Sequence, residues 1–121
     1  MSYFKLIRRL PIFSDLSLVI IDRIAKSEAQ AKAYQETRWR KAGELLTLAP
    51  MPKQGFAVVI RGELGGFSKT WLYAVTQTER EAQKIARHTA KAFPFLGVEI
   101  MPLNDMRLNS YFLTNETEGD K

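Results

Sequence analysis

The N-terminal part of the chain spaces its apolar residues in a way that suggests a helix. Between residues 14 and 48 the sequence is rich in Ala, Glu, Gln, Lys and Arg and contains no proline. Ser14 and Asp15 could cap its start, because such side chains accept from free helix amides or favour the helix dipole. The strongest apolar positions are Leu16, Val19, Ile20, Ile21 and Ile24, followed after an Ala-rich middle by Leu45, Leu46 and Leu48. The pattern predicts one helix over residues 15–48, with two helices broken near Thr37 or Gly43 as the alternative.

A pair of strands is predicted after this helix. Pro50 and Pro52 interrupt the helical pattern, since proline disfavours helix at its own position and at the residue before it. Residues 56–64 and 70–75 are rich in β-branched and aromatic side chains, and Gly65-Gly66 lies between them. Such runs separated by a glycine turn predict two paired strands.

A second helix and one or two further strands are predicted next. Thr78 and Glu81 match a capping box, and apolar residues at helical spacing continue from there to Phe93. Residues 96–101 predict a third strand, and the helix between it and the second strand would make a right-handed crossover if the two strands run parallel. Residues 110–113 could add a short fourth strand.

The order of these elements predicts an α+β fold. It consists of a long N-terminal helix followed by a ββαβ(β) unit, in a two-layer helix-on-sheet sandwich. A chain of 121 residues has room for one hydrophobic core. We therefore expect a single domain over residues 1–113 and a polar, mobile tail over residues 114–121. No internal repeat is evident.

One segment resembles known nucleic-acid modules. Over residues 56–93 the order of strand, Gly-rich turn, strand and Thr-x-x-Glu-Ala helix is similar to that of double-stranded-RNA-binding and integrase-arm-like domains. The resemblance covers roughly a third of the chain, and no diagnostic motif of either family accompanies it. No functional residue is carried over from these families.

The composition and the apolar runs indicate in which compartment the protein is expected. The chain contains no cysteine, which excludes disulfides and thiolate metal sites and fits a reducing compartment. The N-terminus lacks the pattern of a signal peptide. The apolar run over residues 18–21 is far shorter than the roughly 20 residues that cross a bilayer. These features predict a cytoplasmic protein without integral membrane association.

Motifs for catalysis and metal binding are missing. A single histidine and no cysteine leave no ligand cluster, so no metal or cofactor is expected. His88 lies one position off the apolar face of the second helix, which is typical of a surface histidine. Residues 62–66 lack the spacing of a dinucleotide-binding loop, and no nucleophile elbow occurs. We expect a protein that is not an enzyme.

The positive charge supplies the main functional signal. The formal net charge of +5 favours a polyanionic partner. Spacings of four, three and four residues place Arg80, Lys84, Arg87 and Lys91 on one face of the second helix. A second group, Arg38, Arg40 and Lys41, surrounds Trp39 and could combine phosphate pairing with base stacking. These seven cations predict a nucleic-acid-binding site.

Two other classes of function remain open. An adaptor or inhibitor could use the long first helix or a sheet edge, and its basic charge would steer it to an acidic protein partner. Lys5, Arg8 and Arg9 lie among apolar residues and could contact an anionic surface, although such segments more often pack on their own domain. The Ala-rich first helix could also pair two copies of the chain in a homo-oligomer.

Overall fold

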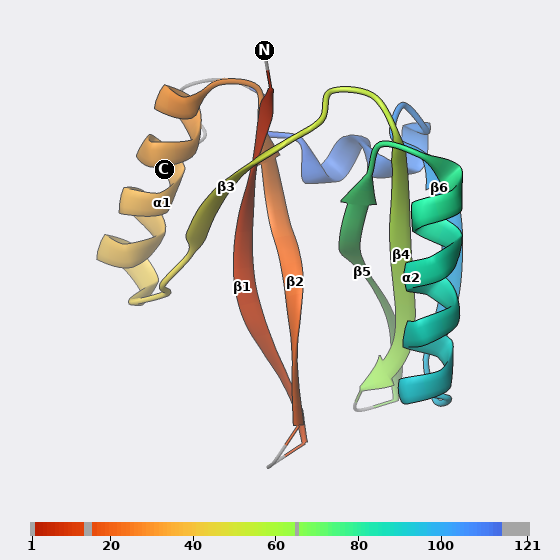
Figure 1. Ribbon diagram of the computed structural model, residues 1–121. Helices are drawn as coiled ribbons and strands as arrows, with labels where there is room; N and C mark the ends of the chain where they lie inside the picture. The colour runs from red at the N-terminus through yellow and green to blue at the C-terminus, as the bar shows by residue number, and fades with distance from the viewer. Residues whose placement is uncertain (1, 14–15, 65, 115–121) are drawn as a thin grey trace.

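The computed structural model describes residues 2–13, 16–64 and 66–114. Its strands are β1 (Tyr3–Phe13), β2 (Leu16–Ala25), β3 (Thr47–Met51), β4 (Phe56–Leu64), β5 (Phe67–Thr76) and β6 (Gly97–Pro102), and its helices are α1 (Glu28–Ala42), α2 (Glu79–Ala92) and the 3-10 helix η1 (Met106–Tyr111). The strands form one sheet in the order β3-β1-β2-β5-β4-β6, paired antiparallel. Figure 1 shows α1 beside the β3-β1-β2 half and α2 beside the β5-β4-β6 half.

The predicted fold class is wrong at its N-terminus, because β1 and β2 form a hairpin where a long helix was expected. Leu18 and Ile20 are buried while Val19 between them is 55% exposed, so burial alternates with the period of a strand. β-branched side chains are stiff and pack well on a pleated surface, which explains why this run prefers a strand. The predicted cap at Ser14 and Asp15 lies outside the described residues.

The first helix is accordingly short. α1 begins after Ser27, whose side chain accepts a hydrogen bond from the Gln30 amide. It ends at Gly43, where a φ of 65° is the left-handed conformation that glycine commonly supplies at a helix C-terminus. Pro50 lies within β3, an edge strand, where a missing N–H is tolerated. Gly43, and not the pair of prolines, therefore separates helix from strand.

The prediction is close for the second half of the chain. The expected strands and helix correspond to β4, β5, α2 and β6, and the capping box is confirmed, with Thr78 and Glu81 each accepting from the other's backbone amide. β5 and β6 are both antiparallel to β4, which lies between them. Residues 110–113 do not form the expected strand, because η1 extends to Tyr111 and Phe112 makes a single bridge to Ile24. Of the predicted tail, only Thr114 is described.

The two halves of the chain repeat one unit. Each half consists of a hairpin, a helix and a strand that pairs with the first strand of its own hairpin. β5 begins 51 residues after β2, α2 begins 51 residues after α1, and β6 begins 50 residues after β3. The fold is therefore a tandem pair of ββαβ units, which the sequence pattern did not reveal.

The sequence preserves traces of this repeat. Residues 27–31 are Ser-Glu-Ala-Gln-Ala, and residues 78–82 are Thr-Glu-Arg-Glu-Ala, so both helices begin in the same way. A Met-Pro pair lies at the end of the third strand of both units, at residues 51–52, where Met51 is the last residue of β3, and at residues 101–102, where Pro102 is the last residue of β6. The one register pair between β2 and β5 is Ile21 opposite Leu72, which are themselves 51 residues apart. Equivalent residues face each other when two like units meet about a two-fold axis. The junction of β2 and β5, where Ile21 lies opposite the equivalent Leu72, therefore resembles the interface of a symmetric dimer.

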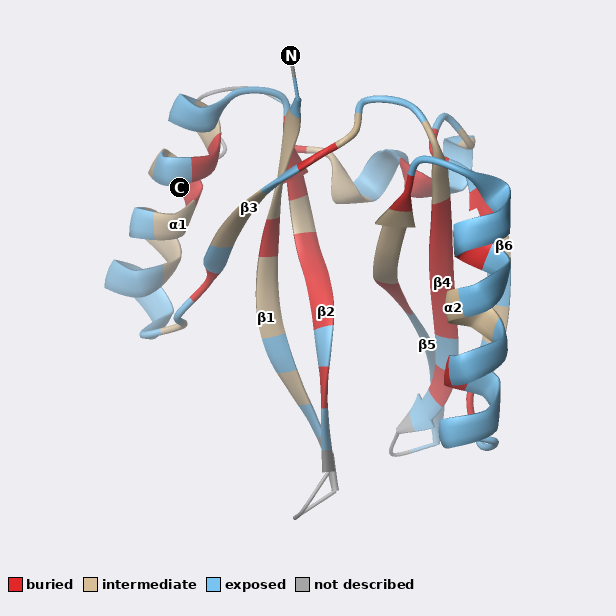
Figure 2. Cartoon of the chain, in the orientation of Figure 1, coloured by how far each residue is buried: buried red, intermediate tan, exposed pale blue. Residues whose placement is uncertain are grey.

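The core is divided among the layers of the fold. Ala31 and Tyr34 of α1 pack in a cluster with Leu6 of β1. Phe93, at the end of α2, packs against a cluster that includes Ile60 and Trp71. A third cluster lies at the junction of the halves, where η1 covers it with Leu108; its buried members are Ile21, Ile24, Met51, Ala57, Val59, Leu72, Met101, Leu103 and Leu108. Figure 2 shows these buried positions along the strands, with the outward surface of α2 exposed.

Candidate functional site

The four predicted cations of α2 lie on its outer surface. Arg80, Lys84, Arg87 and Lys91 are all exposed. Within the described part of the chain, none of the four forms an ion pair. We call these four residues the α2 stripe. Their side chains are free to meet an anionic partner.

The local sequence explains why the α2 stripe faces solvent. At 100° per residue, the four cations fall within an arc of about 60° on the helix. Ala82 and Thr89, which are buried, lie on the opposite side and face the sheet. Glu81 lies off the stripe, and its carboxylate is held by Thr78 in the capping box. Glu79, the other acidic residue of α2, accepts a hydrogen bond from Gln83, and neither glutamate forms an ion pair with the stripe in the described structure.

The second predicted cluster, Arg38, Arg40 and Lys41, does not join this surface. Figure 1 shows α1 and α2 at opposite sides of the molecule. Arg38 turns inward, where it pairs with Asp22 and Glu44, and Arg40 pairs with Glu36 on the next turn. Lys41 is exposed at the end of α1. The structure thus separates the seven predicted cations into a free group on α2 and a largely engaged group on α1.

Asp22 organises the polar network that holds Arg38. Its carboxylate accepts from Arg8 Nε at 2.8 Å, from Arg38 Nη1 at 3.2 Å and from the Tyr34 hydroxyl at 3.3 Å. Burial raises the pKa of the Tyr34 hydroxyl above its ordinary value of 10.0, and the nearby negative charge of Asp22 raises it further. The hydroxyl therefore stays protonated and can donate to Asp22. This network ties β1, β2 and α1 together, so Arg8 and Arg38 serve the fold.

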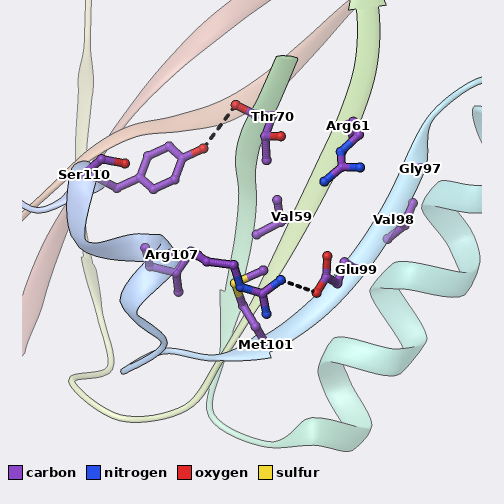
Figure 3. Close-up of a pocket in the computed structure, with 11 residues that line it drawn as sticks. Val59, Arg61, Thr70, Gly97, Val98, Glu99, Met101, Arg107 and Ser110 are labelled. Atoms are coloured by element: carbon purple, nitrogen blue, oxygen red, sulfur yellow. Dashed lines mark hydrogen bonds and ion pairs between the residues drawn. The ribbon is translucent and has the colours of Figure 1, made fainter. Parts of the chain in front are cut away.

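A groove that the sequence did not predict lies between η1 and the β5-β4-β6 half of the sheet. It measures about 540 Å³ and is lined by Val59, Arg61, Thr70, Gly97, Val98, Glu99, Met101, Arg107, Leu108, Ser110 and Tyr111. Figure 3 shows the side chains that line it. Val59, Met101 and Leu108 are buried, whereas Arg61, Glu99 and Arg107 are exposed. Val59 belongs to the junction core, while the adjacent Ile60 belongs to the cluster under α2. The groove therefore lies on the face of this half-sheet that points away from α2.

Hydrogen bonds at both ends of η1 fix the walls of the groove. Arg107 donates to Glu99 at 2.8 Å and to the two carboxylate oxygens of Asp105 at 3.1 and 3.0 Å. The hydrogen bonds to Asp105, and after them the bond to Glu99, raise the pKa of the Arg107 guanidinium. The bonds from Arg107 in turn lower the pKa of the Asp105 carboxyl group. Tyr111 donates to the Thr70 carbonyl at 3.1 Å, and burial raises the pKa of its hydroxyl. The wall formed by η1 is thereby anchored to both β6 and β5.

Neither a metal-binding cluster nor a membrane-spanning helix is found in the described part of the chain. The structure contains no group of three or more His, Asp or Glu side chains placed to hold a metal ion among the residues that it describes. His88 is exposed beside the α2 stripe. Neither described α-helix has the length and hydrophobicity needed to cross a membrane. Comparison of the chain with protein-family models, with curated proteins and with solved structures gives no match.

Proposed function

We propose that this protein binds nucleic acid through the α2 stripe, as a small binding protein without catalytic activity. The observation that carries the proposal is the set of four exposed cations on one helix face that form no ion pair within the described residues. Free guanidinium and ammonium groups displace counterions from phosphates, which supplies most of the affinity in non-specific binding. A cytoplasmic location fits the proposal, because a chain without cysteine suits a reducing compartment.

The repeated unit offers an internal comparison that supports this role. With the 51-residue offset, the α2 stripe corresponds on α1 to Ala29, Ala33, Glu36 and Arg40. Three of these four positions carry no positive charge, yet α1 occupies the same place in its own ββαβ unit. The fold therefore does not require the stripe, and a binding role accounts for it better than packing does.

The dimensions of the stripe set the size of the expected effect. Eleven residues separate Arg80 from Lys91, which at a rise of 1.5 Å per residue corresponds to roughly 16 Å. Four phosphate contacts would give a slope of log K against log salt of about −3.6 on duplex DNA and about −2.8 on single strands. The affinity for a duplex should thus fall about 150-fold when salt rises from about 50 to about 200 mM.

Fluorescence anisotropy with labelled duplex and single-stranded oligonucleotides tests this prediction. In a variant with Arg80, Lys84, Arg87 and Lys91 all changed to Gln, we expect the salt slope to approach zero and binding to be lost at physiological salt. Glutamine keeps a helix propensity similar to that of Lys and Arg, and the four sites are exposed, so the fold should survive.

The matched control removes the same number of charges elsewhere. Lys26, Lys32, Lys53 and Lys69 are exposed and lie outside α2, and their replacement by Gln should leave the salt slope near that of the wild type. Equal losses in both variants would mean that net charge alone drives binding, and the proposed interface would be rejected.

A protein partner remains the second candidate, because one apolar groove lies open beside α1. Trp39 is 57% and Leu45 is 79% exposed, and both line a groove of about 480 Å³. Exposed aromatic and aliphatic side chains that lie together often mark a docking surface. The two candidates use different surfaces, so a partner that docks here would bind the quadruple α2 variant as well as it binds the wild type.

A further inference from the structure

The groove beneath η1 combines an apolar floor with a charged rim. Val59, Met101 and Leu108 on the floor are 5%, 4% and 1% exposed, so they already belong to the core. Its volume of about 540 Å³ falls in the range typical of small-molecule sites. A mostly apolar concavity with a few fixed polar groups at its edge is the usual construction of a ligand pocket.

Arg61 is the one cation on this rim that has no partner among the described residues. Glu99 is the one acidic residue in the described lining, and it is paired with Arg107. Arg107 in turn directs its remaining contacts to Asp105. Figure 3 shows Arg61 on the strand beside that of Glu99, with no interaction drawn to its guanidinium. The rim therefore offers one free positive charge above an apolar floor.

In the first ββαβ unit, no element equivalent to η1 follows the third strand among the described residues. Arg9 lies opposite Val19 in the first hairpin, as Arg61 lies opposite Thr70 in the second. After β6 the chain folds back as η1, whereas after β3 it continues into β4. Part of the corresponding face of the first unit is exposed, since Val19 on it is 55% exposed. Among the described residues, η1 thus forms a wall near Arg61 that the order of elements does not place beside Arg9.

We propose that this groove binds a small organic carboxylate with an apolar body. The guanidinium of Arg61 would hold the carboxylate, since its fork of N–H groups matches a carboxylate in geometry and charge. The apolar body would lie on Val59, Met101 and Leu108. The bond between Tyr111 and Thr70 and the pairing of Arg107 with Glu99 keep the walls in place before binding. This site is separate from the α2 stripe and independent of any role in nucleic-acid binding.

Equilibrium dialysis of the full chain with radiolabelled octanoate tests the proposal. The wild type should bind octanoate saturably, and Arg61→Gln should weaken binding about tenfold or more, as expected for loss of a charge-assisted contact. Gly97→Val should weaken it as well, because a Cβ at Gly97 points beside Arg61 and meets the Arg61 Cβ at an ordinary 3.7 Å. Circular dichroism of each variant confirms that the fold is retained.

Matched controls separate the site from general surface effects. Arg9→Gln removes the corresponding arginine of the first unit and should leave octanoate binding unchanged. An excess of octanol, which lacks the charge, and of inorganic phosphate, which lacks the apolar chain, should fail to displace octanoate. The proposal would be overturned if either competitor displaced octanoate as effectively as unlabelled octanoate does. It would also be overturned if Arg61→Gln bound octanoate as tightly as the wild type, or if the wild type showed no saturable binding.

Discussion

Replacing Leu72 with alanine is expected to lower the free energy of unfolding by about 4 kcal/mol. The Leu72 side chain is fully buried in the junction core, opposite Ile21, where the two ββαβ units meet. Shortening it leaves a cavity between side chains from both units, and neither sheet half can close it without moving the other. Urea unfolding followed by tryptophan fluorescence measures the effect, because Trp71 next to Leu72 is buried.

Leu45→Ala is the control for this substitution. Leu45 is 79% exposed, so its truncation should change stability by less than about 0.5 kcal/mol. If Leu72→Ala lowered the free energy of unfolding by less than about 1 kcal/mol, its effect would be close to that of a surface substitution. That result would mean that the junction is not a packed core. The two units would then be held together mainly by the chain that connects them.

Changing Asp22 to alanine is expected to lower the free energy of unfolding by about 3 kcal/mol. Asp22 is 9% exposed, and its removal would leave Arg8 without its ion-pair partner and Arg38 with Glu44 as its remaining ion-pair partner among the described residues. Uncompensated charge near the core is strongly unfavourable, but the side chains of Arg8 and Arg38 are 28% and 24% exposed, so water relieves part of the loss. Thermal unfolding at neutral pH should show the change as a lower Tm.

The exposed pair between Arg40 and Glu36 serves as the comparison. Its side chains are 70% and 64% exposed, and Glu36→Ala should change stability by no more than about 0.5 kcal/mol. If the two substitutions lowered the free energy of unfolding equally, the Asp22 network would stabilise the protein no more than an exposed ion pair does. A structural role for Arg38 would then be contradicted.

Local signals in the sequence predicted the second unit well. The capping box at Thr78 and Glu81 sets the start of α2 through contacts within one turn. The spacing of the α2 stripe depends only on the helical period, so its outward face follows once the helix is known. Both features could be predicted because they need no information from distant residues.

The first unit was mispredicted because its local signals conflict. Ala-rich residues 28–42 do form a helix, but the run from Leu18 to Ile21 is compatible with a helix face and with a strand. The strand prevails because β1 and β5 lie on either side of β2 and supply its hydrogen bonds. The pairing with β1 is a local hairpin, whereas the pair of Ile21 with Leu72 joins β2 to a strand 51 positions further along the chain. The periodicity of residues 18–21 reports neither pairing.

Tertiary contacts also explain what was missed at the candidate sites. Arg38 looked like a surface cation, yet it pairs with Asp22 of β2, sixteen positions before it in the sequence. The groove beneath η1 depends on the packing of residues 106–111 against β4 and β6, which no local pattern indicates. The repeat went unnoticed because few residues match beyond the two helix starts and the Met-Pro pairs.

The interface on α2 is tested most directly by titrating an oligonucleotide duplex into isotopically labelled protein and following the backbone amide resonances. The proposed function predicts chemical-shift changes concentrated at residues 79–92, with little change at Arg38, at Arg40 or along the groove beneath η1. The changes should be reversed as salt is raised. Shifts centred on α1, on the groove or nowhere at saturating duplex would contradict the account.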